Sequence, residues 1–366
     1  MRSTHQTAGR SFWIGLTSLA LASLPLASGA FAQANFSVYA SGLEGPRGLK
    51  FGPDGALYVA EAGKGGPTSS ASLDCEQVPG PVGPYHGGLS ARISKITGPG
   101  QVTTVVDGLP SAMSSLPTGD TLGAADVAFV GNTLYALVAG GGCSHGNPDT
   151  PNGIIKVDVA LHTWSYVADL SAFEMANPPV NPTPELVDWE PDGSWYGLVA
   201  VRGDLYATEP NHQQIDRISP DTGKVSLVAD ISGSSSLWVG PTAITYHGNF
   251  FFGNLAPFPI SLGDANVFKL TPSGNFKVWE TSFTTVVGVV FDQHDNLYVL
   301  ELSAAPGFPS LAAGKIVRVS PSGQTEDILT GLSVPTAMTI GPDGALYVSN
   351  FGAAPPGLGQ ILRVEP

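Results

Sequence analysis

Charged side chains are scarce in this sequence, and basic ones most of all. Asp, Glu, Lys and Arg make up 13% of the 366 residues, and 16 Lys and Arg stand against 30 Asp and Glu, which gives a formal net charge of −14. An average globular protein has roughly 25% charged residues. Binding to nucleic acid or to anionic membranes requires clustered Lys and Arg. The composition therefore excludes both as partners.

Long apolar runs are missing everywhere except near the N-terminus. Arg2 and Arg10 precede an apolar run over 12–26, and Ala30 and Ala32 are small residues at the positions that a signal peptidase recognises. We expect residues 1–32 to be a signal peptide cleaved after Ala32, which places the product in the periplasm or outside the cell. No other segment reaches the roughly 18 apolar residues of a membrane helix, so no membrane insertion is expected after cleavage.

Cysteine is limited to Cys75 and Cys143, and the pair does not form a CxxC motif. In an oxidising compartment an even pair of cysteines favours a disulfide over two free thiols. Several catalytic motifs are absent too: there is no HExxH motif, Walker loop or dinucleotide fingerprint. Zincin-type metalloprotease and nucleotide-dependent mechanisms therefore lack their usual residues.

Glycine and proline, by contrast, are abundant, with 46 and 31 residues. Helix interiors reject both, whereas short strands joined by tight turns use both. A six-fold repeat agrees with this composition: an apolar residue, an aromatic and a further apolar stretch recur at 57–61, 134–138, 205–209, 250–254, 297–301 and 346–350. The last three spacings match a four-stranded propeller blade of roughly 40–50 residues, and the first two exceed it by insertions.

The chain ends before the sixth repeat has a fourth strand. Segment 36–43 precedes the first repeat and resembles the fourth strands of the others. We therefore predict an all-β fold, a six-bladed β-propeller over residues 33–366, in which the N-terminal strand completes the last blade. Such closure removes the free sheet edges that promote aggregation.

Connections on one face of this predicted propeller are much longer than those on the other. They cover 62–91, 106–123, 139–153, 169–195, 253–266 and 301–314. They include both cysteines and His145, and His212 is expected on the same face. Long loops on a rigid scaffold are where binding usually resides. The alternative is that these loops only plug the central channel.

The residue at the end of each repeat motif forms a predicted ring of carboxylates and amides. Glu61, Glu209 and Glu301 fall in alternate blades. Carboxylates and amides could coordinate a hard cation, Ca²⁺ or Mg²⁺, around which His145 or His212 would act as a general base. The alternative is structural, with the carboxylates accepting hydrogen bonds from nearby backbone amides.

The residues that open the inner strands lie nearest the propeller axis. Arg47, Asp126 and Tyr196 are among them. Arg47 is predicted to receive an anionic ligand, or else to pair with Glu61 or Asp126. Asp126 is the only carboxylate at these positions, which disfavours a calcium site built directly on the axis.

The 169–195 insertion is rich in aromatic residues, with Trp189, Trp195 and Tyr196 at its end. These rings could stack on an aromatic or sugar ring. Alternatively, they form an aromatic plug over the channel.

Segment 42–63, with its GPRGLKFGPDGALYVAEAG sequence, resembles the ScyD/ScyE family of secreted propellers with NHL-like repeats, and segments 173–174, 196–198 and 334–348 extend the resemblance. The family is named for the gene cluster of the cyanobacterial pigment scytonemin. The resemblance implies a six-bladed extracytoplasmic propeller, and one member class is linked to late assembly of an indolic-phenolic pigment. It carries over no catalytic residues.

Three functions remain open at this point. The first is binding of a small aromatic or carbohydrate-like ligand, or of a protein partner, on the long-loop face through Arg47, Asp126, His145, Trp189, Trp195, Tyr196 and His212. The second is a metal-assisted lactone hydrolase or lyase that uses the three ring glutamates. The third is a structural or assembly factor without a small ligand.

Overall fold

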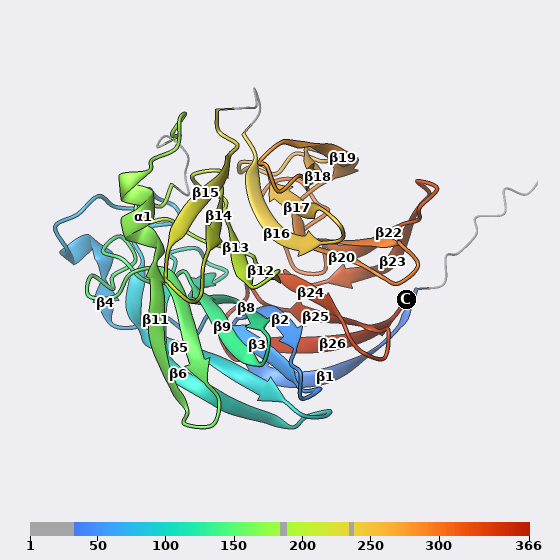
Figure 1. Cartoon of the computed structure of the whole chain (residues 1–366), viewed down its shortest axis with the longest axis horizontal. Coiled ribbons are helices and arrows are strands. Elements are labelled where there is room, and N and C mark those ends of the chain that lie inside the picture. Colours follow the sequence, from blue (N-terminus) through green and yellow to red (C-terminus); the bar gives the residue numbers. More distant parts are fainter. Residues whose placement is uncertain (1–32, 184–188, 234–237) are drawn as a thin grey trace, which may run out of the picture. The chain divides into compact units, whose positions relative to one another are not determined.

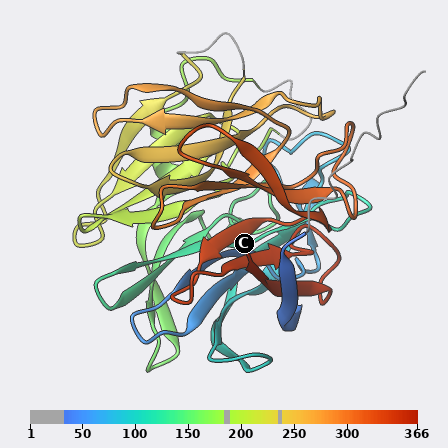
Figure 2. The same cartoon turned by 90° about the vertical axis from the view of Figure 1, so that its right-hand side faces the viewer.

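The computed structural model describes residues 33–183, 189–233 and 238–366, and these ranges form six antiparallel β-sheets arranged in a ring (Figures 1 and 2). The expected six-bladed propeller is therefore confirmed. The expected signal peptide, residues 1–32, lies outside the described residues.

Each blade runs from an inner strand at the propeller axis to an outermost strand at the rim. Blade 1 contains β2 (Pro46–Phe51), β3 (Leu57–Glu61), β5 (His86–Ile96) and β6 (Val102–Met113), extended by β7 (Thr121–Leu122) and by β4 (Thr68–Ser69), which pairs with β5. Blade 2 contains β8 (Ala124–Val130), β9 (Thr133–Val138), β10 (Gly153–Asp158) and β11 (Thr163–Asp169). Blade 3 contains β12 (Leu198–Val201), β13 (Asp204–Glu209), β14 (Gln214–Ile218) and β15 (Val225–Asp230).

The remaining three blades have the same arrangement from axis to rim. Blade 4 contains β16 (Gly240–Tyr246), β17 (Phe250–Leu255), β18 (Ala265–Leu270) and β19 (Phe276–Phe283). Blade 5 contains β20 (Val286–Phe291), β21 (Leu297–Glu301), β22 (Gly314–Val319) and β23 (Thr325–Leu332). Blade 6 contains β24 (Ala337–Ile340), β25 (Leu346–Asn350), β26 (Gly359–Glu365) and β1 (Asn35–Leu43).

The ring closes inside blade 6, as the sequence predicted. Strand β1 pairs antiparallel with β26, from Asn35 opposite Glu365 to Leu43 opposite Gly359, and the two strands lie side by side in Figure 1. Around the axis, each inner strand contacts the inner strands of the two neighbouring blades, and β24 contacts β2. The first and last blades are thereby held together by chain segments from opposite ends of the sequence.

The second strand is the most buried element of blades 1, 5 and 6, because neighbouring blades cover both of its faces. Every residue of β3, β21 and β25 is buried, which explains why the repeat motif is apolar throughout instead of alternating. The tyrosines in this motif are anchored by the preceding turns: the hydroxyl groups of Tyr58 and Tyr347 donate to Asp54 and Asp343 at 3.0 and 3.2 Å. The GPDG turns that precede the motif thus also fix its aromatic side chain.

Helical structure is sparse in the described part of the chain. It comprises the 3₁₀ turn η1 (Ser70–Ser72) and the helix α1 (Leu170–Ala176), which follows β11 and whose first turn is capped by the Asp169 side chain. Within the same ranges there is no helix with the length and apolar character needed to cross a membrane.

A charge on the buried side of β1 should therefore open the ring. Ala40 is buried among Leu43, Leu49 and Tyr347, and the substitution Ala40→Asp would bury an unpaired carboxylate, which should lower the free energy of unfolding by about 3 kcal/mol. Urea denaturation measures this change. The matched variant Val38→Asp alters an exposed position of the same strand and should stay within about 0.5 kcal/mol of the unmodified protein; equal losses in the two variants would contradict the proposed closure.

Candidate functional site

A cavity of about 540 Å³ lies at the propeller axis. All six inner strands or the residues directly before them contribute to its wall, together with loops of the long-loop face. Its aromatic lining residues are Tyr85, Trp195, Tyr196, Trp238, Phe258 and Phe308. Most other lining residues are aliphatic, Pro or Gly, so the cavity suits an apolar, flat ligand better than a heavily hydroxylated one.

Arg47, predicted near the axis, lines this cavity. Its Nη2 donates to Oδ1 of Asp120 at 2.5 Å and to the backbone oxygen of Thr121 at 2.6 Å. The expected partners Glu61 and Asp126 are therefore wrong: Glu61 pairs with Arg92 at 2.8 Å, and the loop before β8 supplies the partner of Arg47. The guanidinium is largely buried and already paired, and it forms a polar part of the cavity wall.

Asp126 also lines the cavity, and it joins two blades. Its Oδ2 accepts a hydrogen bond from the backbone amide of Leu198 in blade 3 at 2.8 Å, and Oδ1 accepts one from Val127 at 2.8 Å. Burial raises the pKa of Asp126, although Lys50 and the two amides oppose the shift. A Cβ at Gly48 would lie 1.8 Å from Oδ1, so this glycine leaves the space that the carboxylate fills.

Tyr196 lies just before β12 and reaches toward blade 6. Its hydroxyl donates to the backbone oxygen of Thr336 at 2.6 Å, and burial raises its pKa. This contact connects blade 3 with blade 6 next to the cavity. Tyr196 is thus held as a rigid, neutral part of the cavity wall.

The two tryptophans of the insertion have different positions. Trp195 is 2% exposed, lines the cavity, and donates through Nε1 to Asp216 at 3.3 Å. Trp189 is 8% exposed, is not among the described lining residues, and packs edge-on against His212 with ring centroids 4.3 Å apart. Both rings are packed inward, and Trp195 is the one of the two that lines the cavity.

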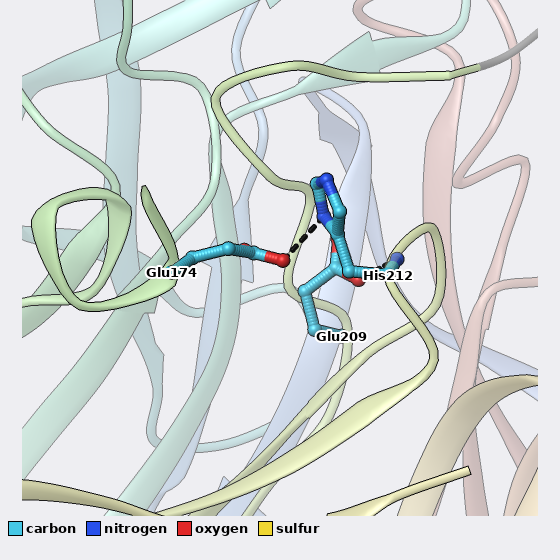
Figure 3. A group of neighbouring side chains, drawn as sticks. All are labelled: Glu174, Glu209 and His212. Atoms are coloured by element: carbon cyan, nitrogen blue, oxygen red, sulfur yellow. Dashed lines mark hydrogen bonds and ion pairs between the residues drawn. The ribbon is translucent and has the colours of Figure 1, made fainter. Parts of the chain in front are cut away.

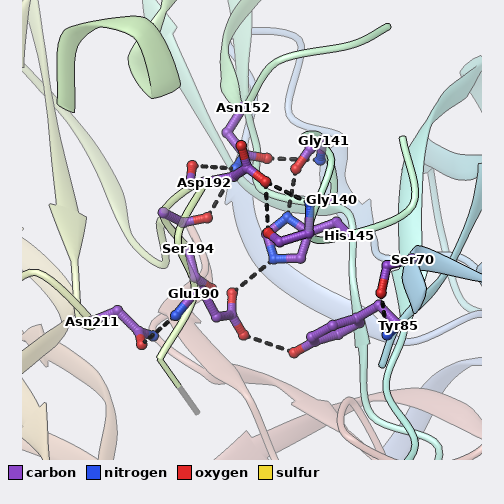
Figure 4. A network of polar contacts seen from close by, with 12 residues as sticks. Ser70, Tyr85, Gly140, Gly141, His145, Asn152, Glu190, Asp192, Ser194 and Asn211 are labelled. Atoms are coloured by element: carbon purple, nitrogen blue, oxygen red, sulfur yellow. Dashed lines mark hydrogen bonds and ion pairs between the residues drawn. The ribbon is translucent and has the colours of Figure 1, made fainter. Parts of the chain in front are cut away.

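His145 belongs to a chain of hydrogen bonds that ends at the cavity wall (Figure 4). The Tyr85 hydroxyl donates to Oε1 of Glu190 at 2.7 Å, and the other carboxylate oxygen lies 3.0 Å from Nε2 of His145. Nδ1 of His145 lies 2.5 Å from the Gly141 backbone oxygen. Burial opposes protonation of His145, but Glu190 and the Gly141 oxygen outweigh it and raise its pKa.

Neighbouring side chains hold this network in place. Asp192 accepts hydrogen bonds from the backbone amide and the hydroxyl of Ser144 at 2.7 and 2.6 Å. Asn152 accepts from the Gly141 amide at 2.7 Å and donates to the backbone oxygens of Asp192 and Gly193. The loop that carries His145 is thereby tied to the insertion that carries Glu190.

The predicted disulfide is present, between Cys75 and Cys143. It joins the loop after β3 to the loop after β9, on adjacent blades. Because Cys143 lies two residues before His145, the bridge also restrains one end of the hydrogen-bonded chain.

The ring glutamates do not share one group of ligand atoms. Among the described residues, the only set of three metal-ligating side chains with ligand atoms within 4.8 Å contains Glu209 but neither Glu61 nor Glu301. Glu61 accepts from the Glu44 amide at 2.7 Å, and Glu209 accepts from the Ser194 amide at 2.7 Å. These contacts match the structural alternative, in which ring carboxylates bind backbone amides.

His212 lies beside the carboxyl groups of Glu174 and Glu209 (Figure 3), and it is not among the residues that line the cavity. Its Nδ1 forms a close ion pair with Glu174 and lies 3.5 Å from Oε2 of Glu209. Burial opposes protonation of His212, but Glu209 and Glu174 outweigh it and raise its pKa to about 10. Burial and the charge of Glu209 raise the pKa of Glu174 to about 8.

Several site residues do not follow from the sequence. Tyr85, Trp238, Phe258 and Phe308 lie in irregular loops, where no periodic pattern indicates which side chains face the axis. Glu174 stands out in the sequence only through the family resemblance. The clustering of aromatic and proline residues in the long loops indicates that these loops form the site. It does not indicate which individual side chains line the cavity.

No protein-family model matches the chain, and no curated protein matches it in sequence. Solved structures do match. A Bacteroides thetaiotaomicron protein of unknown function is similar with a TM-score of 0.57 at 13% identity, over 90% of this chain and 75% of that one. A gluconolactonase from Xanthomonas campestris is similar with a TM-score of 0.51 at 10% identity, over 91% of this chain and 90% of that one. At these identities the likeness shows the six-bladed propeller fold alone.

The pairing of His145 predicts a pH-dependent contribution to stability. Because its pKa is raised above the unfolded value of 6.5, protonated His145 stabilises the fold fully below about pH 6.5, and this contribution is lost as the pH rises through the folded-state pKa. His145→Gln should therefore cost about 2 kcal/mol at pH 6 and less at higher pH. Urea unfolding of both proteins across pH 6–9 tests this, and a difference that grows with pH would contradict it.

Proposed function

We propose that this protein binds a small aromatic molecule in its axial cavity. The observation that carries the proposal is the cavity itself: about 540 Å³, at the meeting point of all six blades, and lined mainly by apolar and aromatic side chains. Ligand sites of this size usually combine such a lining with a few fixed polar groups. Arg47, Asp126 and Tyr196 supply those groups in this cavity.

The polar groups are already oriented by the protein before any ligand arrives. Arg47 is held by Asp120 and Thr121, and Tyr196 is held by Thr336. A ligand therefore meets a rigid wall, which lowers the entropic cost of binding. The buried positions of Trp189 and Trp195 support a role for them in shaping the wall, with Trp195 alone in contact with the cavity.

The chain is further proposed to be a secreted propeller of the ScyD/ScyE type, as the sequence resemblance implies. The Cys75–Cys143 disulfide supports an oxidising compartment, which agrees with periplasmic or extracellular localisation after cleavage at Ala32. A family member linked to assembly of an indolic-phenolic pigment would need an aromatic site of this kind. The alternative is that a partner protein docks on the long-loop face. Such docking would not use the cavity, so filling the cavity would impair ligand binding but not docking.

Filling the cavity should abolish capture of aromatic molecules. Ala337 lines the cavity, so Ala337→Phe should weaken binding of indole or 2-naphthol at least about tenfold, measured by calorimetry alongside methyl glucoside as a carbohydrate probe. The control Ala160→Phe makes the same change in the exposed turn between β10 and β11 and should bind as the unmodified protein does. Equal affinity in the two variants, or no binding of either aromatic probe, would refute the proposal.

A second candidate function is that of a lactone hydrolase or lyase, which the sequence predicted to be metal-assisted through Glu61, Glu209 and Glu301. Because these three glutamates share no group of ligand atoms among the described residues, the reaction is proposed here for the cavity wall. The hydrogen-bonded chain from Tyr85 through Glu190 to His145 favours it, because Tyr85 and Glu190 line the cavity and could move a proton at the Glu190 carboxylate. The similar fold of a gluconolactonase makes gluconolactone a reasonable first substrate.

Removal of the Glu190 charge tests this second function. If the chain hydrolyses lactones with Ca²⁺ or Mg²⁺ present, Glu190→Gln should lower kcat at least about 100-fold, because the proton acceptor at the cavity wall is lost. Glu76→Gln changes an exposed carboxylate in the loop that also carries Tyr85 and should leave the rate unchanged. Turnover that persists in Glu190→Gln would exclude this mechanism.

A further inference from the structure

Away from the cavity lining, a buried cluster of ionisable side chains lies between α1 and blade 3. Glu174 comes from α1, Glu209 from the end of β13, and His212 from the turn between β13 and β14 (Figure 3). One ligand atom from each lies within 4.8 Å of the others, and all three residues are buried. Three separate chain segments thus direct ligating atoms to one point.

Several buried carboxyl groups share a single cationic side chain at this point. Asp216 adds a third buried carboxylate close by, and its electrostatic influence reaches both Glu174 and Glu209. Across the described ranges, no Lys or Arg forms an ion pair with any of these carboxylates, and His212 is their sole cationic partner. Buried carboxyl groups ionise at a high cost unless a cation compensates them, so a bound cation would stabilise the ionised cluster.

Two carboxylate oxygens in the cluster also have no hydrogen-bond donor. Oε2 of Glu174 and Oδ1 of Asp216 are buried without a partner among the described residues. The Glu174 side chain is only about 5% exposed, so solvent water does not supply the missing hydrogen bond to this oxygen. Gly193 leaves this oxygen its space, because a Cβ there would lie 2.5 Å from it.

We propose that Glu174, Glu209 and His212 bind a divalent transition-metal cation, of which Zn²⁺ is the representative. The cation would replace the direct ion pair between His212 and Glu174 and neutralise the two carboxylates. It would also cross-link the α1 insertion to blade 3. This site is distinct from the axial cavity and from the ring of Glu61, Glu209 and Glu301.

The ligand set favours a transition metal over Ca²⁺. Imidazole nitrogen suits Zn²⁺ and its neighbours in the first row, whereas Ca²⁺ takes six to eight oxygen ligands. Two carboxylates and one histidine match the three protein ligands that Zn²⁺ accepts when water completes its coordination. Glu209 can take part although Ser194 and His212 already donate backbone amides to it, because each carboxylate oxygen has a second lone pair.

Blade 5 offers a natural control at the equivalent position of the repeat. Glu301, which ends β21 as Glu209 ends β13, is also buried and has one unpartnered oxygen, Oε2. Its nearest charged group is Lys315 at 3.8 Å, and no histidine or second carboxylate completes a ligand group within the described chain. Glu301→Gln therefore removes a comparable buried charge without touching the proposed site.

Titration of the purified, metal-stripped protein with Zn²⁺ tests the proposal by calorimetry and by elemental analysis after dialysis. We expect one equivalent of Zn²⁺ per chain, a higher melting temperature with Zn²⁺ than with EDTA, and an anomalous scattering peak beside His212. Glu174→Gln, which keeps the side-chain shape, and His212→Gln should each weaken binding at least about tenfold, while Glu301→Gln should bind as the unmodified protein does.

Three results would overturn the proposal: no stoichiometric Zn²⁺, an equivalent retained at full affinity in Glu174→Gln, or a loss of binding in Glu301→Gln. The last result would instead support the ring of alternate glutamates as the cation site. If His212→Gln does not fold, Glu174→Gln alone decides, because it removes charge without removing a hydrogen bond from the backbone.

Discussion

The antiparallel pairing of β1 with β26 is the interaction on which the rest of this structure depends. A propeller blade buries both faces of its second strand only while both neighbouring blades are in place, so an open ring would expose the most apolar strands of the molecule. Closure by strands from the two ends of the chain also fixes where the six inner strands meet. The axial cavity exists because those strands converge without filling the centre.

Side-chain hydrogen bonds between blades then set the shape of that centre. Thr336 donates to the Pro46 oxygen across the closure, and Thr242 donates to the Val286 oxygen between blades 4 and 5. Asp126 and Tyr196 add similar contacts from blade 2 to blade 3 and from blade 3 to blade 6. Thr336, Asp126 and Tyr196 thus hold blades together and also contribute to the polar part of the cavity wall.

Buried carboxylates in this protein have different roles because the fold gives each of them different hydrogen-bond and ion-pair partners. Glu61 receives Arg92, Ser94 and a backbone amide, and it is fully satisfied as a structural acceptor. Glu190 receives Tyr85 and His145, which connects it to the cavity. Glu174 has only the ion pair with His212 and an oxygen left without a donor among the described residues. The repeat position is shared by Glu61, Glu209 and Glu301, but the surrounding loops decide what each carboxylate does.

The sequence by itself determined the six blades, the closing strand, the face with long loops and the cysteine pair, because repeated apolar motifs and turn residues act locally and recur at a regular spacing. It also placed Arg47, Asp126 and Tyr196 near the axis. Only the tertiary structure decided that Asp120 pairs with Arg47, that Trp189 packs on His212, and that Glu174 meets Glu209. Those contacts join irregular loops far apart in the chain, whose paths depend on packing against the finished propeller and follow no periodic pattern.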